Sequence, residues 1–304
     1  MNAVSPPRLT LGPLLLHWSA EKRRDFYYRI ADEAPIDTVY LGEVVCSKRE
    51  PAAAAYFDRV AARLRAAGKG IVISTLALVT SKREIGHIRE LAAAGAMLEA
   101  NDVATVQLLA GAPYVAGPHI NVFNEGTRDF LARRGAARIV LPVELSTASI
   151  RLIARGAGAT EIEIQAFGRQ TLSVAMRCYH ARSHNLTKDH CQIVCGLDAD
   201  GLTASTIDGR EVLKINGTQT QTFEYGVLLP QLASLRDAGV THLRLAPQDI
   251  DMVRVADLYA RTLTGAVAAD EALAELRLVT GDVPYANGFA LGRAGAAWSA
   301  VPTA

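Results

Sequence analysis

The sequence predicts a (β/α)8 barrel. Short β-branched or apolar runs alternate with stretches rich in Ala, Leu, Arg and Glu at helical spacing over about 250 residues. Eight such strand–helix units fit a chain of 304 residues. The alternative is a doubly wound open sheet, but Leu11-Gly12-Pro13 after the first strand is not the glycine-rich turn that binds dinucleotides. The barrel is therefore the preferred fold class.

Each element follows from a local pattern. The strands are the short β-branched or apolar runs, at residues 9–16, 38–41, 70–76, 97–99, 114–116, 138–141, 161–167 and 241–245. The helices are the amphipathic stretches at residues 21–32, 52–67, 82–94, 103–110, 127–134 and 146–155. A glycine follows most of these helices, which is a signal for the C-terminal end of a helix. We interpret residues 1–304 as a single barrel domain.

The regular spacing breaks between the seventh and eighth strands, where about 70 residues intervene. Within them, residues 198–221 are rich in Gly, Thr and Gln and show little helical periodicity. We expect an insertion loop over residues 168–222 and a C-terminal extension over residues 265–304, with one helix at 270–278. Barrel enzymes carry variable loops and the active site at the carboxyl ends of the strands, so the insertion is the first place to look for function.

Charge and hydropathy exclude several classes of protein. The chain has 32 Lys plus Arg against 31 Asp plus Glu, a net charge of +1, so we expect no nucleic-acid partner. Its apolar runs fall far short of the roughly 18 residues needed to cross a bilayer, so we expect no membrane span. The first residues lack the basic region and cleavage site of a secretory signal, which makes a cytoplasmic protein the default expectation.

The four cysteines carry the strongest functional signal. Cys178, Cys191 and Cys195 lie in the insertion among polar residues, and Cys46 follows the second strand. In a barrel both positions are at the same rim, which brings four thiols to one end of the fold. Thiolates in this number select zinc or an iron-sulfur cluster, and the spacing alone leaves both possibilities open. Histidines in the same segment could replace a cysteine; these are His180, His184 and His190.

Three runs, LGEVVCSKRE at residues 41–50, ISTLALV at 73–79 and LPVELS at 141–146, together with the three-cysteine segment, resemble iron-sulfur members of the collagenase-like peptidase family. The resemblance implies a 4Fe-4S cluster bound by Cys46, Cys178, Cys191 and Cys195. It also implies a heterodimer with a paralogue, UbiU, that carries its own cluster. The implied activity is oxygen-independent hydroxylation of a quinone precursor in ubiquinone biosynthesis, with prephenate as the oxygen donor.

Two other functions remain open: a metal-dependent peptidase of the same family, and a zinc-stapled scaffold that binds a partner. For the hydroxylation, the candidate catalytic residues are polar groups at strand ends or beside the cysteines, namely Arg49, Arg177, Glu43 and Asn121. An aromatic diacid needs cationic partners, and the planar fork of arginine pairs with a carboxylate, which favours Arg49 and Arg177. The competing interpretation is that these charged groups pair with one another across the rim and hold loops in place.

Overall fold

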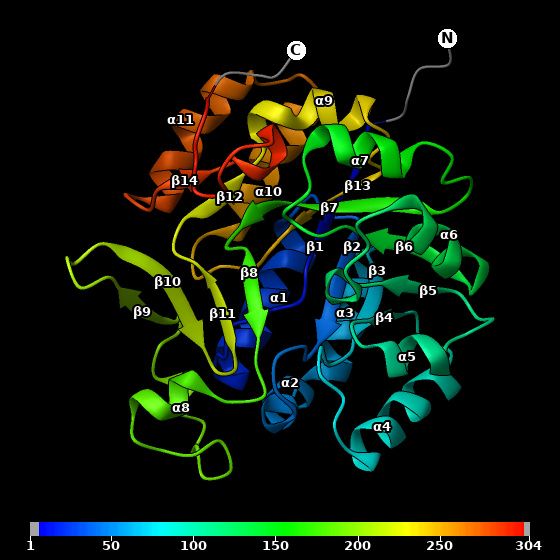
Figure 1. The fold of residues 1–304 in the computed structure, drawn as a ribbon, viewed down its shortest axis with the longest axis vertical. Helices are drawn as coiled ribbons and strands as arrows, with labels where there is room; N and C mark the ends of the chain where they lie inside the picture. Colours follow the sequence, from blue (N-terminus) through cyan, green and yellow to red (C-terminus); the bar gives the residue numbers. More distant parts are fainter. Residues whose placement is uncertain (1–5, 301–304) are drawn as a thin grey trace.

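Eight parallel strands close into a barrel in the computed structural model, which describes residues 6–300 (Figure 1). In order these strands are β1 Arg8–Leu11, β2 Thr38–Gly42, β3 Gly70–Ser74, β4 Leu98–Ala100, β5 Tyr114–Ala116, β6 Ala136–Val140, β7 Glu161–Gly168 and β13 His242–Leu245. β13 pairs with both β1 and β7, which closes the ring. The predicted fold class is confirmed. Residues 1–5 and 301–304 of the predicted single domain lie outside the described residues.

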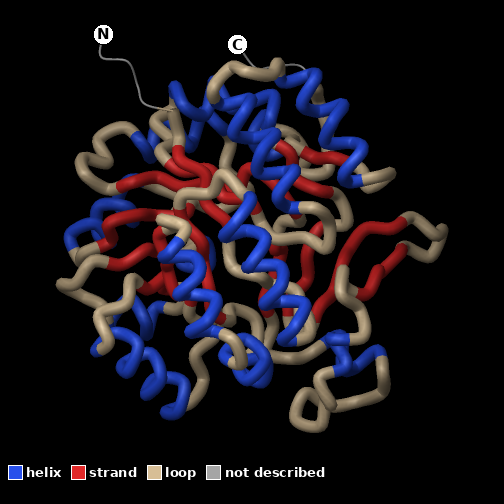
Figure 2. The backbone as a smooth tube through the Cα atoms, turned by 180° about the vertical axis from the view of Figure 1, so that it is seen from behind, coloured by secondary structure: helices blue, strands red, loops and turns tan. Residues whose placement is uncertain are grey.

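Helices surround the barrel (Figure 2). They are α1 Ala20–Glu33, α2 Glu50–Ala54, α3 Phe57–Ala66, α4 Lys82–Ala93, α5 Val103–Leu108, α6 Glu125–Arg133, α7 Thr147–Ala154, α9 Leu232–Asp237, α10 Met252–Leu263 and α11 Ala269–Thr280. Several begin where a side chain caps free backbone amides, at Ser19, Ser81, Asp102, Asn124, Ser146 and Asp251. Among the described helices, none is long and apolar enough to cross a membrane.

The two faces of the barrel sheet are packed differently. Outward-facing residues of the strands, such as Val39, Ile139 and Leu243, belong to the main apolar core between sheet and helices. A separate small cluster of Tyr40, Val72, Val115 and Val140 is formed by residues of β2, β3, β5 and β6. Because successive side chains of a strand point to opposite faces, this second set fills the inside of the barrel.

The insertion after β7 is a second sheet rather than a loop. β8 Thr171–Val174, β9 Leu202–Ser205, β10 Glu211–Asn216 and β11 Gln219–Thr222 pair antiparallel in the order β8-β11-β10-β9. The short helix α8 Tyr179–Ser183 and the cysteine segment lie between β8 and β9, and Figure 1 shows them beyond one end of this sheet. The chain returns through β12 Tyr225–Val227, which pairs antiparallel with β7, and the later β14 Tyr285–Ala286 pairs with β12.

The insertion loop expected over residues 168–222 therefore contains a sheet, and the little helical periodicity of residues 198–221 agrees with its strands. Strands this short offer too few alternating positions for a pattern, but two turns carry a signal that predicts them. Asp208-Gly209 lies between β9 and β10, and Asn216-Gly217 begins the turn between β10 and β11. Asp-Gly and Asn-Gly are the dipeptides that tight hairpins prefer, because their backbones adopt positive φ at low cost.

Other element boundaries differ from the predicted ones. The predicted helix at 52–67 is two helices, α2 and α3, because Tyr56 has φ −126° and ψ 16°, outside the helical region. The first strand ends at Leu11 rather than at residue 16. α9 and α10 are additional helices, and with them the structure completes the seventh and eighth units of the barrel.

Candidate functional site

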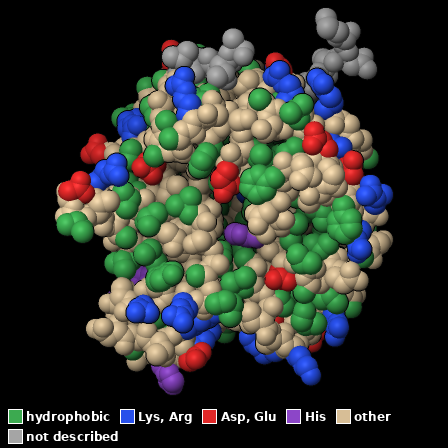
Figure 3. Space-filling view, viewed as in Figure 1, with side chains coloured by type: hydrophobic (Ala, Val, Ile, Leu, Met, Phe, Trp, Pro, Cys, Tyr) green, Lys and Arg blue, Asp and Glu red, His purple; other side chains and the backbone are tan. Residues whose placement is uncertain are grey.

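A cavity of about 380 Å³ lies at the carboxyl ends of the barrel strands, between the barrel and β8. The molecule is also hollowed near the centre of the face drawn in Figure 3. Apolar side chains such as Leu15, Leu141 and Leu172 form part of the lining. The polar lining residues are Glu99, Asn101, His119, Asn121, Glu144, Gln165, Thr171, Ser173 and Arg244. Cavities of this kind, apolar with a few converging polar groups, are typical of small-molecule sites in barrels.

The floor of this cavity is a buried network of charges. Arg244 donates from Nη2 to Glu99 Oε1 at 2.7 Å and from Nε to Glu163 Oε1 at 2.6 Å. Tyr40 and Arg138 donate to Glu163 Oε2 at 2.7 and 3.3 Å. Both carboxylates are fully buried. Because Arg244 is committed to two carboxylates, it holds strands β4, β7 and β13 together and is not a free cation for a ligand.

The network fixes protonation states at the cavity. Burial alone would raise the pKa of Glu163, but the charges of Arg244 and Arg138 outweigh it and lower the pKa to about 2. Burial lowers the pKa of His119, which lines the cavity near Glu99 and Arg244. His119 is consequently a neutral imidazole at neutral pH, with one ring nitrogen able to donate and the other able to accept a hydrogen bond.

All four cysteines line a second, smaller hollow. Cys46, Cys178, Cys191 and Cys195 border it together with Lys48, Arg49, Lys188, Ile193, Val194 and Gly217. The hollow has a volume of about 20 Å³, against about 380 Å³ for the barrel cavity. The cysteine segment is thus folded back onto the loop after β2, and Lys48 Nζ donates to the carbonyl oxygens of Lys188 and Asp189 at 2.7 and 2.9 Å across this junction.

The backbone between Cys191 and Cys195 is strained. Gln192 and Ile193 have φ of 48° and 55°, and a β-branched residue such as Ile rarely adopts the left-handed region. Each such residue costs on the order of 1–3 kcal/mol and persists where the surroundings demand it, often at a ligand clamp. This turn brings Cys191 and Cys195 to the same hollow.

Arg49 borders the cysteine hollow and is held in place by hydrogen bonds. Its guanidinium is buried and donates to Leu15 O at 3.1 Å and to Asn216 Oδ1 at 2.7 Å. Among the described residues its Nε–H has no hydrogen-bond partner. Gly217, at φ 72°, leaves room for the guanidinium, because a Cβ there would lie 2.1 Å from Nη2. An unpaired buried donor beside four thiols is suited to a negatively charged sulfur-containing group.

Burial raises the pKa of both Cys46 and Cys195, and the positive charge of Arg49 acts in the opposite direction on each. These two thiols are consequently protonated at neutral pH, and a metal bound to them has to displace their protons. Arg49 and Lys48 then offset the negative charge that the thiolates acquire.

The spacing of the sulfur atoms bears on the kind of group that fits. Four thiolates on one zinc ion at 2.3 Å lie about 3.8 Å from one another. Among the described residues, one set of at least three His, Cys, Asp or Glu side chains has all its ligand atoms within 4.8 Å of one another. That set contains no cysteine. No three of the cysteine sulfur atoms therefore lie as close together as ligands of one zinc ion do.

The structure separates the predicted catalytic residues. Asn121 lines the barrel cavity. Arg49 belongs to the cysteine hollow instead, and Arg177 is exposed and lines neither. Glu43 is buried and accepts hydrogen bonds from the amides of Val45 and Cys46 at 2.9 and 3.2 Å, so it shapes the loop that carries Cys46.

Several residues at both sites could not be identified from sequence patterns. Glu99, Glu163 and Arg244 meet from three different strands, and Asn216 and Lys188 reach the hollow only through tertiary contacts. A charged residue within an apolar strand run is the one signal that could have drawn attention to the first three, because such residues are buried only when paired.

Comparison with known proteins gives a family and two distant structural alignments. The sequence model of Peptidase family U32 matches residues 20–300. A chain of the tryptophan synthase complex from Pyrococcus furiosus aligns with a TM-score of 0.38 and 11% identity, covering 87% of this chain and 97% of that chain. An uncharacterized B. cereus protein aligns with a TM-score of 0.33 and 11% identity, covering 79% of this chain and 61% of that one. Similarity this low carries no argument about the present chain.

Proposed function

Because the chain belongs to peptidase family U32, we propose that it is one of the iron-sulfur members of this family and acts, as UbiV does, in oxygen-independent ubiquinone biosynthesis. The proposed cofactor is a 4Fe-4S cluster on Cys46, Cys178, Cys191 and Cys195. The observation that carries the proposal is that Cys46 lines one hollow with the three cysteines of the insertion, which are far from it in sequence. UbiU is the proposed partner, in a heterodimer.

The surroundings of the hollow support a negatively charged cofactor. Lys48, Arg49 and Lys188 line it, and Figure 3 shows Lys and Arg side chains on the surface around α8. A cluster whose irons are all held by thiolates supplies one-electron transfer rather than an open coordination site. In this proposal Arg49 donates its free Nε–H toward the cluster, and Asn216 and Gly217 hold Arg49 in place.

We assign the barrel cavity to the aromatic ring of the quinone precursor. Apolar side chains such as Leu141 and Leu172 can pack against the ring, and neutral donors and acceptors such as His119, Asn121 and Gln165 can orient ring oxygens. Prephenate carries two carboxylates, and the one arginine in the described lining, Arg244, is already paired with Glu99 and Glu163. We therefore assign prephenate to a site on the partner, or shared with it.

Proteolysis is the second candidate, and the family description is what favours it. A hydrolytic site needs an activated nucleophile or a metal-bound water at a cleft. Among the described residues that line the barrel cavity, neither Thr171 nor Ser173 is hydrogen-bonded to a histidine. Peptide cleavage by the purified chain, lost on removal of metal, would favour this function over electron transfer.

The decisive experiment is anaerobic purification of wild type and Cys191→Ala, with His190→Ala as the matched control in the neighbouring exposed position. Wild type and the control should be brown and contain about four irons and four sulfides per chain. Cys191→Ala should lose most of this iron and the visible absorption. It should also abolish quinone hydroxylation when combined with UbiU without oxygen.

Two results would contradict the proposal. If Cys191→Ala kept both the visible absorption and the hydroxylation, the cluster assignment would be wrong. If the wild-type chain were colourless and held one zinc ion on its cysteines, the zinc-stapled scaffold would replace it.

A further inference from the structure

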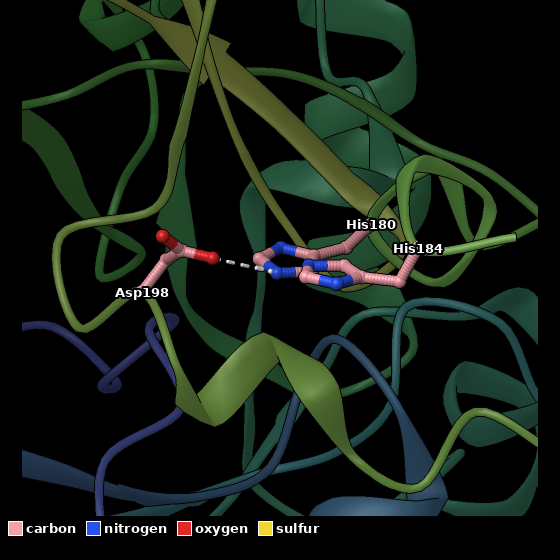
Figure 4. A group of neighbouring side chains, drawn as sticks. All are labelled: His180, His184 and Asp198. Carbon is pink, nitrogen blue, oxygen red and sulfur yellow. Dashed lines mark ion pairs between the residues drawn. The ribbon is translucent and has the colours of Figure 1, made fainter. Parts of the chain in front are cut away.

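A second group of potential metal ligands lies beside the cysteine hollow but is separate from it. His180, His184 and Asp198 have ligand atoms that all lie within 4.8 Å of one another (Figure 4). His180 lies on α8 and His184 follows the end of this helix. Their rings are stacked, with centroids 5.6 Å apart and planes 7° from parallel. The carboxylate of Asp198 faces the edge of the His180 ring.

His180 has one ring nitrogen without a hydrogen bond, beside a carboxylate with which it can form an ion pair. Its side chain is completely buried. Nδ1 lies 3.2 Å from Ile215 O, and Nε2 lies 2.9 Å from Asp198 Oδ2. Both neighbours are acceptors, whereas a neutral imidazole has only one N–H to donate. If Nδ1 carries the proton, Nε2 presents its lone pair to a carboxylate.

The geometry at Nε2 is that of two ligands rather than of a donor and an acceptor. Although Asp198 Oδ2 is close, its direction does not make a hydrogen bond, and Nε2 has no hydrogen-bond partner among the described residues. A nitrogen and an oxygen bound to one metal ion at about 2.1 Å, at right angles to each other, lie about 3.0 Å apart. The observed 2.9 Å fits this arrangement.

The remaining contacts resemble the outer shell of a metal site. A ligating histidine usually donates its other ring N–H to a backbone carbonyl, which is the position of Ile215 O. Asp198 is fixed through its backbone, because Asn216 Nδ2 donates to Asp198 O at 2.9 Å. His184 is exposed, so solvent reaches the site from its side.

We propose that His180, His184 and Asp198 bind a divalent transition-metal ion, distinct from any group held by the four cysteines. Two imidazoles and one carboxylate are the donor set of catalytic zinc and non-haem iron(II) sites, which keep positions open for water or a substrate. The ion ties α8, which begins after Cys178, to the segment that follows Cys195. It therefore braces two of the four cysteines from outside their hollow.

The test uses anaerobic, cluster-loaded protein, so that the cysteines are occupied, and Zn²⁺ as the probe in equilibrium dialysis. We expect one zinc per chain in addition to the cluster iron. His184→Ala and Asp198→Asn should weaken zinc binding by about 100-fold or more, since even outer-shell changes cost 10–100-fold. His190→Ala, an exposed histidine in the same segment, should bind like wild type. His184 is itself exposed, and Asp198→Asn keeps the shape of the side chain, so neither change should prevent folding.

X-ray absorption at the zinc edge provides an independent readout. It should show nitrogen and oxygen neighbours at about 2.0–2.2 Å and no sulfur at 2.3 Å. The proposal is overturned if zinc binds equally well to His184→Ala and Asp198→Asn, or if sulfur is found in the zinc shell. It is also overturned if His184→Ala loses cluster iron instead of zinc, because His184 would then be a cluster ligand. None of these results depends on quinone hydroxylation. A chain without a cluster can still bind zinc at His180, His184 and Asp198.

Discussion

Asn216, at the end of β10, is the residue whose removal should loosen the cysteine hollow most selectively. Its side chain is 1% exposed. Oδ1 accepts from the amide of His17 at 3.0 Å and from Arg49 Nη2 at 2.7 Å. Nδ2 donates to the carbonyl oxygens of Cys195 and Asp198 at 3.0 and 2.9 Å. Asn216→Ala therefore removes four hydrogen bonds, of which two join the insertion to His17 and to Arg49 and two hold the cysteine segment within the insertion.

The magnitude follows from these contacts. A neutral hydrogen bond contributes about 1 kcal/mol and one to a charged group about 2 kcal/mol, so the four together contribute about 5 kcal/mol. Water entering the vacated space offsets part of this loss, and we expect a net cost of about 3 kcal/mol to the closed insertion. Since 1.4 kcal/mol is a factor of ten, local opening should become about 100-fold more frequent.

Hydrogen exchange measures this opening directly. In Asn216→Ala the amides of residues 194–201 and of His17 should exchange about 100-fold faster than in wild type, while barrel amides of β2 and β3 stay unchanged. Glu211→Ala, at the exposed start of the same strand, is the control and should behave like wild type. If Asn216→Ala exchanged within threefold of wild type at these amides, the side chain would not be the anchor that its contacts indicate.

Three further predictions concern Gly217, Arg244 and Glu163. Gly217→Ala forces a Cβ to 2.1 Å from Arg49 Nη2 at φ 72°, so it should cost about 3 kcal/mol in thermal unfolding and lower the iron content. Gly209→Ala, at φ 86° with no atom within 4 Å, should cost only the backbone strain of about 1 kcal/mol. Arg244→Met leaves buried Glu99 without a cation and Glu163 with Arg138 alone, so it should cost about 3–5 kcal/mol in chemical denaturation. Exposed Arg254→Met should be neutral, and equal effects would refute the network. The pKa of Glu163 is about 2 in the folded chain against 4.5 ordinarily. The ionised carboxylate therefore stabilises the folded chain by on the order of 3 kcal/mol, an effect that is complete above pH 4.5 and is lost as the pH falls toward 2. When the pH is lowered from 6 to 3, the free energy of unfolding should fall less steeply for Glu163→Gln than for wild type. Equal slopes of free energy against pH would contradict this prediction.

The barrel could be predicted because its signals are local. A buried parallel strand such as β2 is a short apolar run, and a helix such as α4 has apolar spacing and a capping box formed by Ser81 and Glu84. The insertion sheet was missed because strands such as β9 and β11 have four residues each and few apolar ones. Their pairing depends on the turns between them more than on their own composition.

In the candidate sites, too, some residues could be identified from the sequence and others could not. The cysteines stood out because thiols among polar residues are unusual, and the barrel topology alone places Cys46 and the other three at one rim. Asn216 could not be singled out, and the sequence indicated His180 only as a possible replacement for a cysteine, because the role of a buried amide or imidazole depends on which acceptors surround it. Those acceptors, Cys195 O and Ile215 O, come from the folded insertion.

The amino-acid sequence by itself determined the barrel, the place of the insertion and the identity of four thiol groups, because periodicity, chain length and residue chemistry are properties of short segments. Only the tertiary structure decided which polar side chains meet. The Glu99–Arg244–Glu163 network, the support of Arg49 by Asn216 and the His180–His184–Asp198 group each join residues from separate elements. Hydrogen bonding and metal binding act over about 2–3 Å, so their partners are set by where the chain folds back on itself, not by distance along the sequence.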